Sequence, residues 1–435
     1  MKKKALIWPV LLFTLLFSSA FADSKQLQLT LWHMESRPSR VQAIQGVIDR
    51  FNKANPDLNI KVEVQSWNDA FIKAVAAIQA NKYPDFIFCI PDFNMNLMTT
   101  RKVRPVDDIM TDLQKKYKVY NAAIEPYYFS GKHWAVPLYG MSEVLWYRKD
   151  LFEKAGLNPN KPPKTWSELL EVSKTLVDKG VVKHPIAVAG DWHLATMQQV
   201  YPLMVVNKAE TIIDGKGNIT FDNPRTFAAF RMYKKLFDMS PPGSASWQWD
   251  QPLAAFINGE VAMVIEKGHY MEQWDLRSNL SPKFLGAAPI PVPDQGGQRG
   301  TSYYSNGISL MKSDPNIRTA YKRLVNFLYQ PDNMAGLLVG APGLFLPVTE
   351  EAAKSSVLLD NPTIKLHQKE FELLVDEAKY GKLYGFTQRP YNMDIGRITG
   401  QNLIAWAAQR MIYENMSPEA AVKAGAAKMK ENLND

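Results

Sequence analysis

Residues 131–157, GKHWAVPLYGMSEVLWYRKDLFEKAGL, bring five aromatic residues and three acids into one mostly apolar stretch. The apolar residues do not follow the 3.6-residue period of a single amphipathic helix. We therefore expect a strand in this stretch that ends at residues 139–142. These aromatic side chains could form a core or line a cleft. The segments on either side of the stretch help to decide between the two.

The segments before this stretch alternate between strand and helix patterns. LQLTLW, residues 27–32, places leucines on one face of a strand, and residues 40–56 carry apolar side chains at helical spacing. A strand at 59–67, a helix at 71–80 and an apolar strand at 84–90 follow. This β-α-β-α-β order predicts an α/β fold, in which helices cover both faces of a sheet.

The segments after it continue the alternation. A capping box of Thr165 and Glu168 predicts a helix that ends at Gly180. Residues 212–224, IIDGKGNITFDNP, indicate a hairpin turn rather than a calcium loop, because Lys216 occupies the middle and no bidentate acid follows at the required distance. Further strands are expected at 185–190, 261–268 and 307–311, and a further helix at 314–333.

The amino terminus has the pattern of a cleaved secretory signal peptide. Lys2, Lys3 and Lys4 precede an apolar run too short to span a bilayer, and Ala20-Phe21-Ala22 supplies the cleavage motif. We expect removal of residues 1–22 from the 435-residue chain, which leaves 413 residues from Asp23, enough for two domains. Since no cysteine lies near that site, a lipid anchor has no acceptor and the mature protein should be freely soluble.

Composition and motifs exclude several classes of function. The single cysteine, Cys89, permits no intramolecular disulfide, so stability must come from a large core. Loss of the three lysines would lower the net charge from +8 to +5, and the basic residues are scattered, which argues against nucleic-acid binding. The sequence has no Gly-x-Ser-x-Gly, His-Glu-x-x-His or Walker motif, and its six histidines lack metal-ligand spacing. We therefore expect no metal, no cofactor and no enzymatic activity.

A resemblance to a known family covers nearly the whole mature chain. Residues 131–157 with the PPKTWSELLEVSKTL that follows, PLAAFINGEVAMVIEKGHY, NGISLMKSDPNIRTAYKRLVNFLYQPDN and SPEAAVKAGAAKM stand in the order found in one family. In these segments the chain resembles the extracellular solute-binding proteins of carbohydrate ABC importers, the family of the maltose-binding and glycerol-3-phosphate-binding proteins. The resemblance is specific for the family and not for the ligand.

The resemblance implies two α/β lobes joined by a hinge, with the solute held between them. AVPLYG would form the first crossing and AAPIPVP would lie near the second, so lobe one would comprise residues 23–138 plus 289–338 and lobe two residues 139–288 plus 339–435. Gly140 suits a hinge, because glycine adopts backbone angles that other residues avoid. The implied protein is a periplasmic monomer that captures a sugar or oligosaccharide and delivers it to membrane permease subunits driven by a separate ATPase.

A sugar site needs aromatic rings for the C–H face of the pyranose and directed polar groups for its hydroxyls. In an open α/β sheet these side chains belong at the carboxyl ends of strands. Within the opening stretch, Tyr139 and Met141 should line the cleft, whereas Trp134, Leu145, Trp146 and Tyr147 should be core. The full set of expected ligand-binding residues is Glu35, Arg37, Trp67, Asp92, Tyr139, Met141, Trp192, Trp249, Glu266, Lys267, Gly268, Tyr304, Asn306, Phe345 and Arg389.

Two alternatives stay open at this point. Arg37, Lys267 and Arg389 could instead bind an anionic solute, such as glycerol phosphate, a sugar phosphate or a uronic-acid oligosaccharide. A periplasmic carbohydrate-active enzyme is the more distant alternative. Glu35, Asp92, Glu143 and Glu266 could supply its two carboxylates, although their spacing in the sequence does not bring any two of them together.

Overall fold

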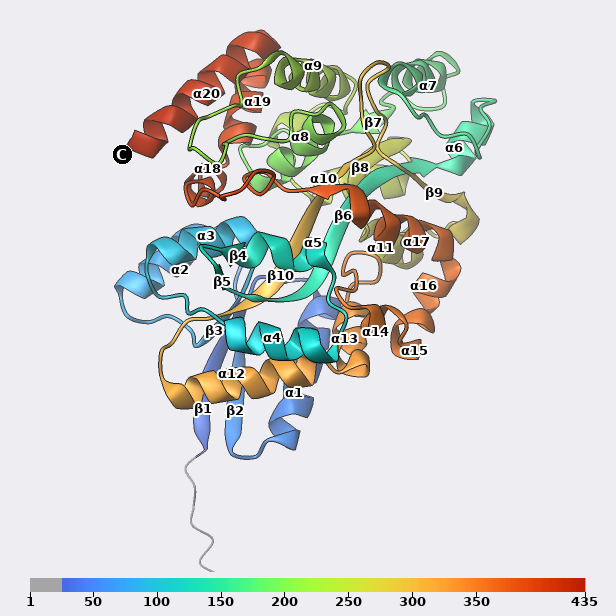
Figure 1. Ribbon diagram of the computed structural model, residues 1–435. Coiled ribbons are helices and arrows are strands. Elements are labelled where there is room, and N and C mark those ends of the chain that lie inside the picture. Colours follow the sequence, from blue (N-terminus) through green and yellow to red (C-terminus); the bar gives the residue numbers. More distant parts are fainter. Residues whose placement is uncertain (1–25, 435) are drawn as a thin grey trace, which may run out of the picture.

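The computed structural model describes residues 26–434, which form two lobes with a waist between them (Figure 1). The expected signal peptide and the expected mature start at Asp23 lie outside the described residues. Within residues 26–434, no helix is both long and apolar enough to cross a membrane. Each lobe combines strands with covering helices, which confirms the expected two-lobe α/β fold.

Lobe one is built on four neighbouring strands in the order β2-β1-β3-β10. β1 pairs in parallel with β2 and β3, whereas β10 (Thr301–Leu310) returns antiparallel to β3. Leu29 and Leu31 of β1 are buried on one face, and α1 buries Val47 and Phe51 in the same core. The elements of lobe one besides β10 are β1 (Leu27–His33), α1 (Pro38–Ala54), β2 (Leu58–Val64), α2 (Ala70–Gln79), β3 (Phe86–Cys89), α3 (Pro91–Thr99), α4 (Asp107–Lys116), α5 (Asn121–Ile124), β4 (Tyr128–Phe129), β5 (Lys132–His133), α12 (Pro315–Leu328), α13 (Pro331–Leu338), α14 (Glu350–Ala353) and α15 (Ser356–Leu359).

Two long strands, β6 (Val136–Arg148) and β10, run together through the waist and join the lobes (Figure 1). The first half of β6 pairs with β10, and its second half pairs with β8 and β9 of lobe two. Gly140 lies in the middle of β6. A Cβ atom there would stand 2.2 Å from the hydroxyl oxygen of Tyr303 on β10, so glycine at this position leaves room for the Tyr303 ring. The φ angle of Gly140 is not positive, so the conformation of this position in the structure does not itself require glycine.

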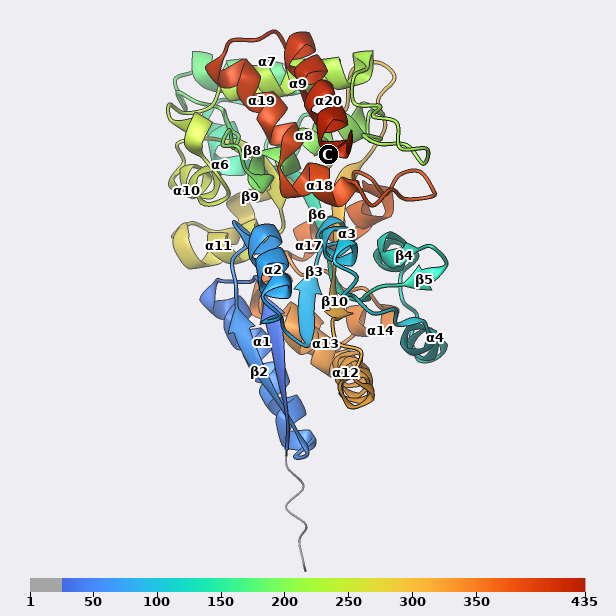
Figure 2. The same cartoon turned by 90° about the vertical axis from the view of Figure 1, so that its left-hand side faces the viewer.

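Lobe two continues the sheet beyond β6 through β8 and then β7. Its central helix, α8, is buried along its whole length, which explains its nearly continuous apolar sequence. Of the C-terminal helices, α19 packs on α8 and α20 packs on α9, whereas α18 packs on α3 of lobe one (Figure 2). The elements of lobe two besides β6 are α6 (Lys149–Lys154), α7 (Trp166–Asp178), β7 (Ile186–Ala187), α8 (Leu194–Val206), α9 (Pro224–Asp238), α10 (Asp250–Asn258), β8 (Met263–Lys267), α11 (Tyr270–Arg277), β9 (Leu285–Ala288), α16 (Pro362–Leu366), α17 (Gln368–Glu377), β11 (Gly381–Lys382), α18 (Ile395–Gly400), α19 (Leu403–Tyr413) and α20 (Pro418–Asn434).

The second and third crossings lie later in the chain than the expected lobe boundaries. After β9, Val292 forms a bridge with Thr165, and the N–H of Gln298 donates to the carbonyl of Val206, so residues 289–300 pack on lobe two. Residues 289–300 therefore contact α8 and the start of α7 before the chain crosses to lobe one as β10. Similarly, α14 and α15 pack on α13 of lobe one, and the chain reaches lobe two only at α16 and α17. From these contacts we propose boundaries at the start of β10 and just before α16, in place of residues 289 and 339.

Local expectations differ from the structure at several places. The strand expected to end at residues 139–142 continues as β6 to Arg148, because its second half pairs with β8 and β9. The strand at 185–190 is reduced to Ile186–Ala187, and the strand expected at 307–311 is part of the longer β10. The 212–224 segment makes the expected turn, in which a carboxylate oxygen of Asp214 accepts the N–H groups of Lys216 and Asn218, but only a single bridge flanks it. Trp146 is fully buried as expected, whereas Trp134 is only half-buried.

Candidate functional site

A cavity of about 470 Å³ opens between the two lobes, and side chains of both lobes line it. On lobe one the lining follows the carboxyl ends of the parallel strands β1, β2 and β3, where ligands bind in open α/β sheets. On lobe two it comes from α8, the start of α10, and the end of β8. The lining consists of Met34, Glu35, Ser36, Arg37, Pro38, Arg40, Ser66, Trp67, Asn68, Ile90, Met141, Leu194, Gln198, Gln248, Trp249, Asp250, Gln251, Glu266, Lys267, His269 and Leu344.

The structure divides the sequence-predicted ligand-binding residues into two groups. The residues that line the cavity are Glu35, Arg37, Trp67, Met141, Trp249, Glu266 and Lys267. The residues that lie outside this lining are Asp92, Tyr139, Trp192, Gly268, Tyr304, Asn306, Phe345 and Arg389. Candidates from both lobes and from the crossing strand β6 thus meet at one cavity.

On the lobe-one wall, Glu35 is the centre of a polar cluster. One carboxylate oxygen lies 2.9 Å from Nη1 of Arg40, and the other accepts the hydroxyl of Tyr139 at 3.2 Å and the indole N–H of Trp67 at 3.5 Å. Tyr139 stacks in turn on Phe345, with ring centroids 3.9 Å apart. Tyr139 and Phe345 therefore support Glu35 from behind rather than lining the cavity themselves.

On the lobe-two wall, Lys267 lies between two carboxylates. Its ammonium group is 3.0 Å from Glu143 and 3.1 Å from Glu266, and it donates to the side-chain oxygen of Gln198 at 2.8 Å. Burial raises the pKa of Glu143 to about 7, although the Lys267 charge opposes that shift. The nearby negative charges of Glu266 and Glu143 offset the burial of Lys267 and hold its pKa above the ordinary value. We call Glu143, Lys267 and Glu266 the ion triad.

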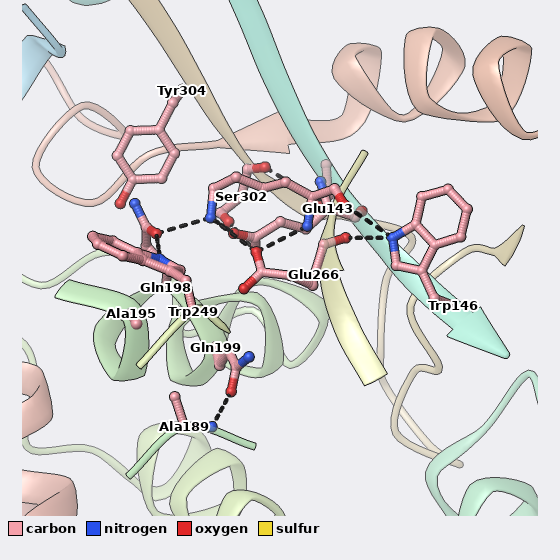
Figure 3. A network of polar contacts seen from close by, with 12 residues as sticks. Glu143, Trp146, Ala189, Ala195, Gln198, Gln199, Trp249, Glu266, Ser302 and Tyr304 are labelled. Carbon is pink, nitrogen blue, oxygen red and sulfur yellow. Dashed lines mark hydrogen bonds and ion pairs between the residues drawn. The ribbon is translucent and has the colours of Figure 1, made fainter. Parts of the chain in front are cut away.

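Trp249 lies beside the ion triad at the start of α10. Its indole N–H donates to the side-chain oxygen of Gln198 at 3.1 Å, and its ring packs edge-on against His193 with centroids 4.5 Å apart. Figure 3 shows Gln198 next to Trp249, while the neighbouring Gln199 is directed away toward Ala189. The indole of Trp249 is therefore fixed by groups on α8 and at its amino-terminal cap.

Two polar contacts join the lobes beside the cavity. Arg37 pairs with Asp250 of lobe two, and Asn68 lies 3.3 Å from Nε2 of His193. Burial lowers the pKa of Arg37, the neighbouring Arg40 lowers it further, and Asp250 opposes both effects. These two contacts link the lobe-one wall of the cavity to the lobe-two wall.

Among the candidates outside the lining, Trp192 and Arg389 are surface residues. The side chain of Trp192 is 49% exposed, and its indole N–H donates to the carbonyl of Gln401 at 2.8 Å. Arg389 pairs with Glu125 and lies over the ring of Tyr391. Neither side chain reaches the cavity described above.

The remaining candidates outside the lining are buried. Burial raises the pKa of Asp92, in the first turn of α3, to about 6. The hydroxyl groups of Tyr304 and Tyr384 are hydrogen-bonded to each other. The side-chain amide of Asn306 has no hydrogen-bond partner among residues 26–434. A Cβ at Gly268 would stand 1.9 Å from the carbonyl oxygen of Gly343, so this glycine permits two backbone segments to pack together.

Sequence reasoning missed several polar residues of the lining. Gln198 was detectable in principle, because Gln198 and Gln199 interrupt an otherwise apolar helix and a buried polar side chain requires partners. Arg40 and Asn68 carry no comparable signal, since each is a polar residue near a helix start or in a loop. Within residues 26–434 there is no group of three or more His, Cys, Asp and Glu side chains arranged to hold a metal ion.

Comparisons with known proteins all point to one family of proteins. Residues 36–335 match the family "Bacterial extracellular solute-binding protein". YcjN of Escherichia coli (strain K12), which carries a provisional name as an ABC transporter periplasmic-binding protein, is 23% identical over 99% of this chain and 98% of its own length. The sn-glycerol-3-phosphate-binding periplasmic protein UgpB of Pectobacterium atrosepticum is 24% identical over 71% of this chain and 70% of its own length.

Solved structures show the same fold. Maltose-bound MalE3 of T. maritima superposes with a TM-score of 0.77 at 19% identity, covering 93% of this chain and 99% of that one. UgpB of Mycobacterium tuberculosis in complex with glycerophosphocholine also gives a TM-score of 0.77, at 16% identity, covering 94% of this chain and 98% of that one. At these identities the likeness establishes the arrangement of the lobes and leaves the ligand open.

Proposed function

We propose, from the premise that the chain belongs to the bacterial extracellular solute-binding protein family, that it binds a neutral sugar or oligosaccharide between its lobes and delivers it to an ABC importer. Proteins of this family bind small solutes and work with ABC permease components. The finer parts of the proposal are a periplasmic location, a monomeric state, a neutral carbohydrate as ligand, and a separate ATPase that drives the permease.

The observation that carries the choice of ligand is the pairing of every cation in the lining with a carboxylate. Arg40 pairs with Glu35, and Arg37 pairs with Asp250. The ammonium group of Lys267 donates to Glu266 and Gln198 and forms an ion pair with Glu143 at 3.0 Å. An anionic ligand would have to compete with these carboxylates for each positive charge, whereas a neutral polyol leaves all the pairs intact.

Aromatic side chains on opposite walls support a sugar in particular. Trp67 belongs to lobe one and Trp249 to lobe two, and each indole N–H is held by a side-chain oxygen. Their ring faces can pack on the C–H surface of a pyranose, while carboxylates and amides nearby accept and donate to hydroxyls. Binding would draw the two walls together, because each lobe contributes one ring and part of the polar lining.

Titration calorimetry with a small panel of solutes tests this proposal. The neutral arm contains maltose, tagatose and ribitol, and the charged arm contains sn-glycerol 3-phosphate, glucuronic acid and glycerophosphocholine. We expect the tightest binding within the neutral arm. Tighter binding of an anion, with an affinity that falls as salt is added, would contradict the assignment of a neutral ligand.

A further inference from the structure

Gln198 is a buried polar residue in the middle of α8, at the edge of the cavity. It is 4% exposed, and its side-chain oxygen accepts two hydrogen bonds, from Nζ of Lys267 at 2.8 Å and from Nε1 of Trp249 at 3.1 Å. A carbonyl oxygen has two lone pairs, and both are used here. Because both partners are obligate donors, the amide must present its oxygen to them, and its orientation is therefore fixed.

The bond from Trp249 determines how its ring is held. The indole has a single polar atom, a donor, and burial of that atom without an acceptor would be costly. The ring is also held on a second side by His193, which caps α8 with its own side chain. Gln198 on α8 and His193 at the start of α8, five residues apart, thus fix the Trp249 ring in a single position.

We propose that Gln198 is a positioning residue, which holds the indole of Trp249 at the cavity wall in the orientation that binds saccharide. The ligand part of this inference rests on the proposed function, whereas the positioning of the ring does not. Lys267 holds Gln198 in turn, and Glu143 of the crossing strand β6 holds Lys267. The ring is therefore linked through these side chains to a strand that joins the lobes.

The chain offers a matched control in the adjacent residue. Gln199 is 3% exposed and lies on the same helix, but its side-chain oxygen accepts the backbone N–H of Ala189, away from the cavity lining. Loss of either amide removes a buried hydrogen bond, so both substitutions should lower stability. Only loss of Gln198 should alter Trp249.

The first experiment needs no ligand. Protein labelled with ¹⁵N-tryptophan is compared as wild type, Gln198→Met and Gln199→Met, and Trp249→Phe identifies the indole resonance of Trp249. We expect the Trp249 indole N–H to shift and to exchange with solvent about fivefold faster in Gln198→Met only, since it has lost its acceptor. Gln198→Glu, which retains an acceptor oxygen, should preserve slow exchange. An unchanged Trp249 resonance in folded Gln198→Met would overturn the proposal; Gln198→Ala replaces that variant if it does not fold.

The second experiment measures coupling in ligand binding, with maltose and tagatose as probes. We expect Gln198→Met to weaken binding about tenfold, and Gln198→Met/Trp249→Ala to bind no more weakly than Trp249→Ala alone. Fully additive losses would mean that Gln198 does not act through Trp249, and the proposal would be wrong. If neither sugar binds the wild type, the proposed ligand class fails for these sugars, while the exchange measurement still decides whether Gln198 positions the ring.

Discussion

Replacement of Glu143 by Gln should change how the stability of the protein depends on pH. Glu143 is fully buried in the ion triad, and burial raises its pKa from an ordinary value of 4.5 to about 7. The folded protein therefore keeps a proton on Glu143 over a pH range in which the unfolded chain has lost it. Because the folded state binds more protons there, the contribution of Glu143 to stability falls as the pH rises from about 4.5 to about 7.

The magnitude follows from the size of the shift. The rise of the Glu143 pKa from 4.5 to about 7 corresponds to a free energy on the order of 3 kcal/mol, at about 1.36 kcal/mol for each pKa unit. The physical origin is burial of the carboxyl group together with the net charge of the ion triad, which is −1 when all three groups are ionised and zero when Glu143 is protonated. The amide of the Glu143→Gln variant does not titrate, so the variant should lack this part of the pH dependence.

Urea unfolding of wild type and Glu143→Gln between pH 4.5 and pH 8 tests the reasoning. The stability of the wild type, measured relative to the variant, should fall by about 3 kcal/mol over this range and become constant above it. Other buried groups, such as Asp92, are present in both proteins and cancel in the difference. Glu153→Gln on the exposed face of α6 controls for removal of a carboxylate. A pH-independent difference, or one of the opposite sign, would refute the assignment of a raised pKa to Glu143.

Four further predictions concern the cavity and the contacts between the lobes. Trp67→Ala and Trp249→Ala should each weaken saccharide binding by about 2 kcal/mol or more, with little change in folding. Calorimetry would measure the binding, and thermal unfolding of the same samples would measure the stability. Early melting with normal binding would contradict the stacking role of these rings. Trp192→Ala should leave the affinity unchanged, because its ring lies outside the cavity lining, and a loss comparable to that of Trp249→Ala would count against the site described here. Arg389→Ala should leave ligand binding unaffected, because Arg389 pairs with Glu125 outside the cavity lining, and a loss of about 1.5 to 3 kcal/mol would show that Arg389 contacts the ligand and would count against this site. Arg37→Ala combined with Asn68→Ala should raise the ligand-free radius of gyration in solution scattering, since both contacts that join the lobes beside the cavity are lost, and an unchanged radius would show that they do not hold the lobes closed.

Much of the fold could be predicted from the sequence, because helical and strand periodicities are local properties. The boundaries of the lobes could not, since they depend on which distant segment a strand pairs with. Residues 289–300 illustrate this difficulty: the family resemblance implied a crossing near AAPIPVP, yet these residues first pack on α7 and α8. The crossing itself is β10, whose pattern resembles that of any buried strand.

The strand ends that form the site could be predicted from the sequence, whereas the individual side chains that face the cavity could not. The rule that ligands bind beyond the carboxyl ends of strands selected Glu35 after β1, Trp67 after β2 and Glu266 at the end of β8, and all three line the cavity. The same rule selected Tyr139 and Trp192, which lie behind or outside the lining. Whether a side chain faces the cavity depends on tertiary contacts such as the stacking of Tyr139 on Phe345, which no local pattern encodes.

The position of the ion triad suggests why a binding protein would keep three charges buried. Buried ion pairs contribute little to stability, but they fix geometry, because each charge requires its partners in place. Here Glu143 lies on β6, Lys267 and Glu266 lie on β8, and Ser302 of β10 donates to Glu143. The triad therefore fastens the two crossing strands to the wall that carries Trp249. Bending between the lobes should then occur on the lobe-one side of Glu143, near Gly140, so that the lobe-two half of the site moves as one body when the cavity closes.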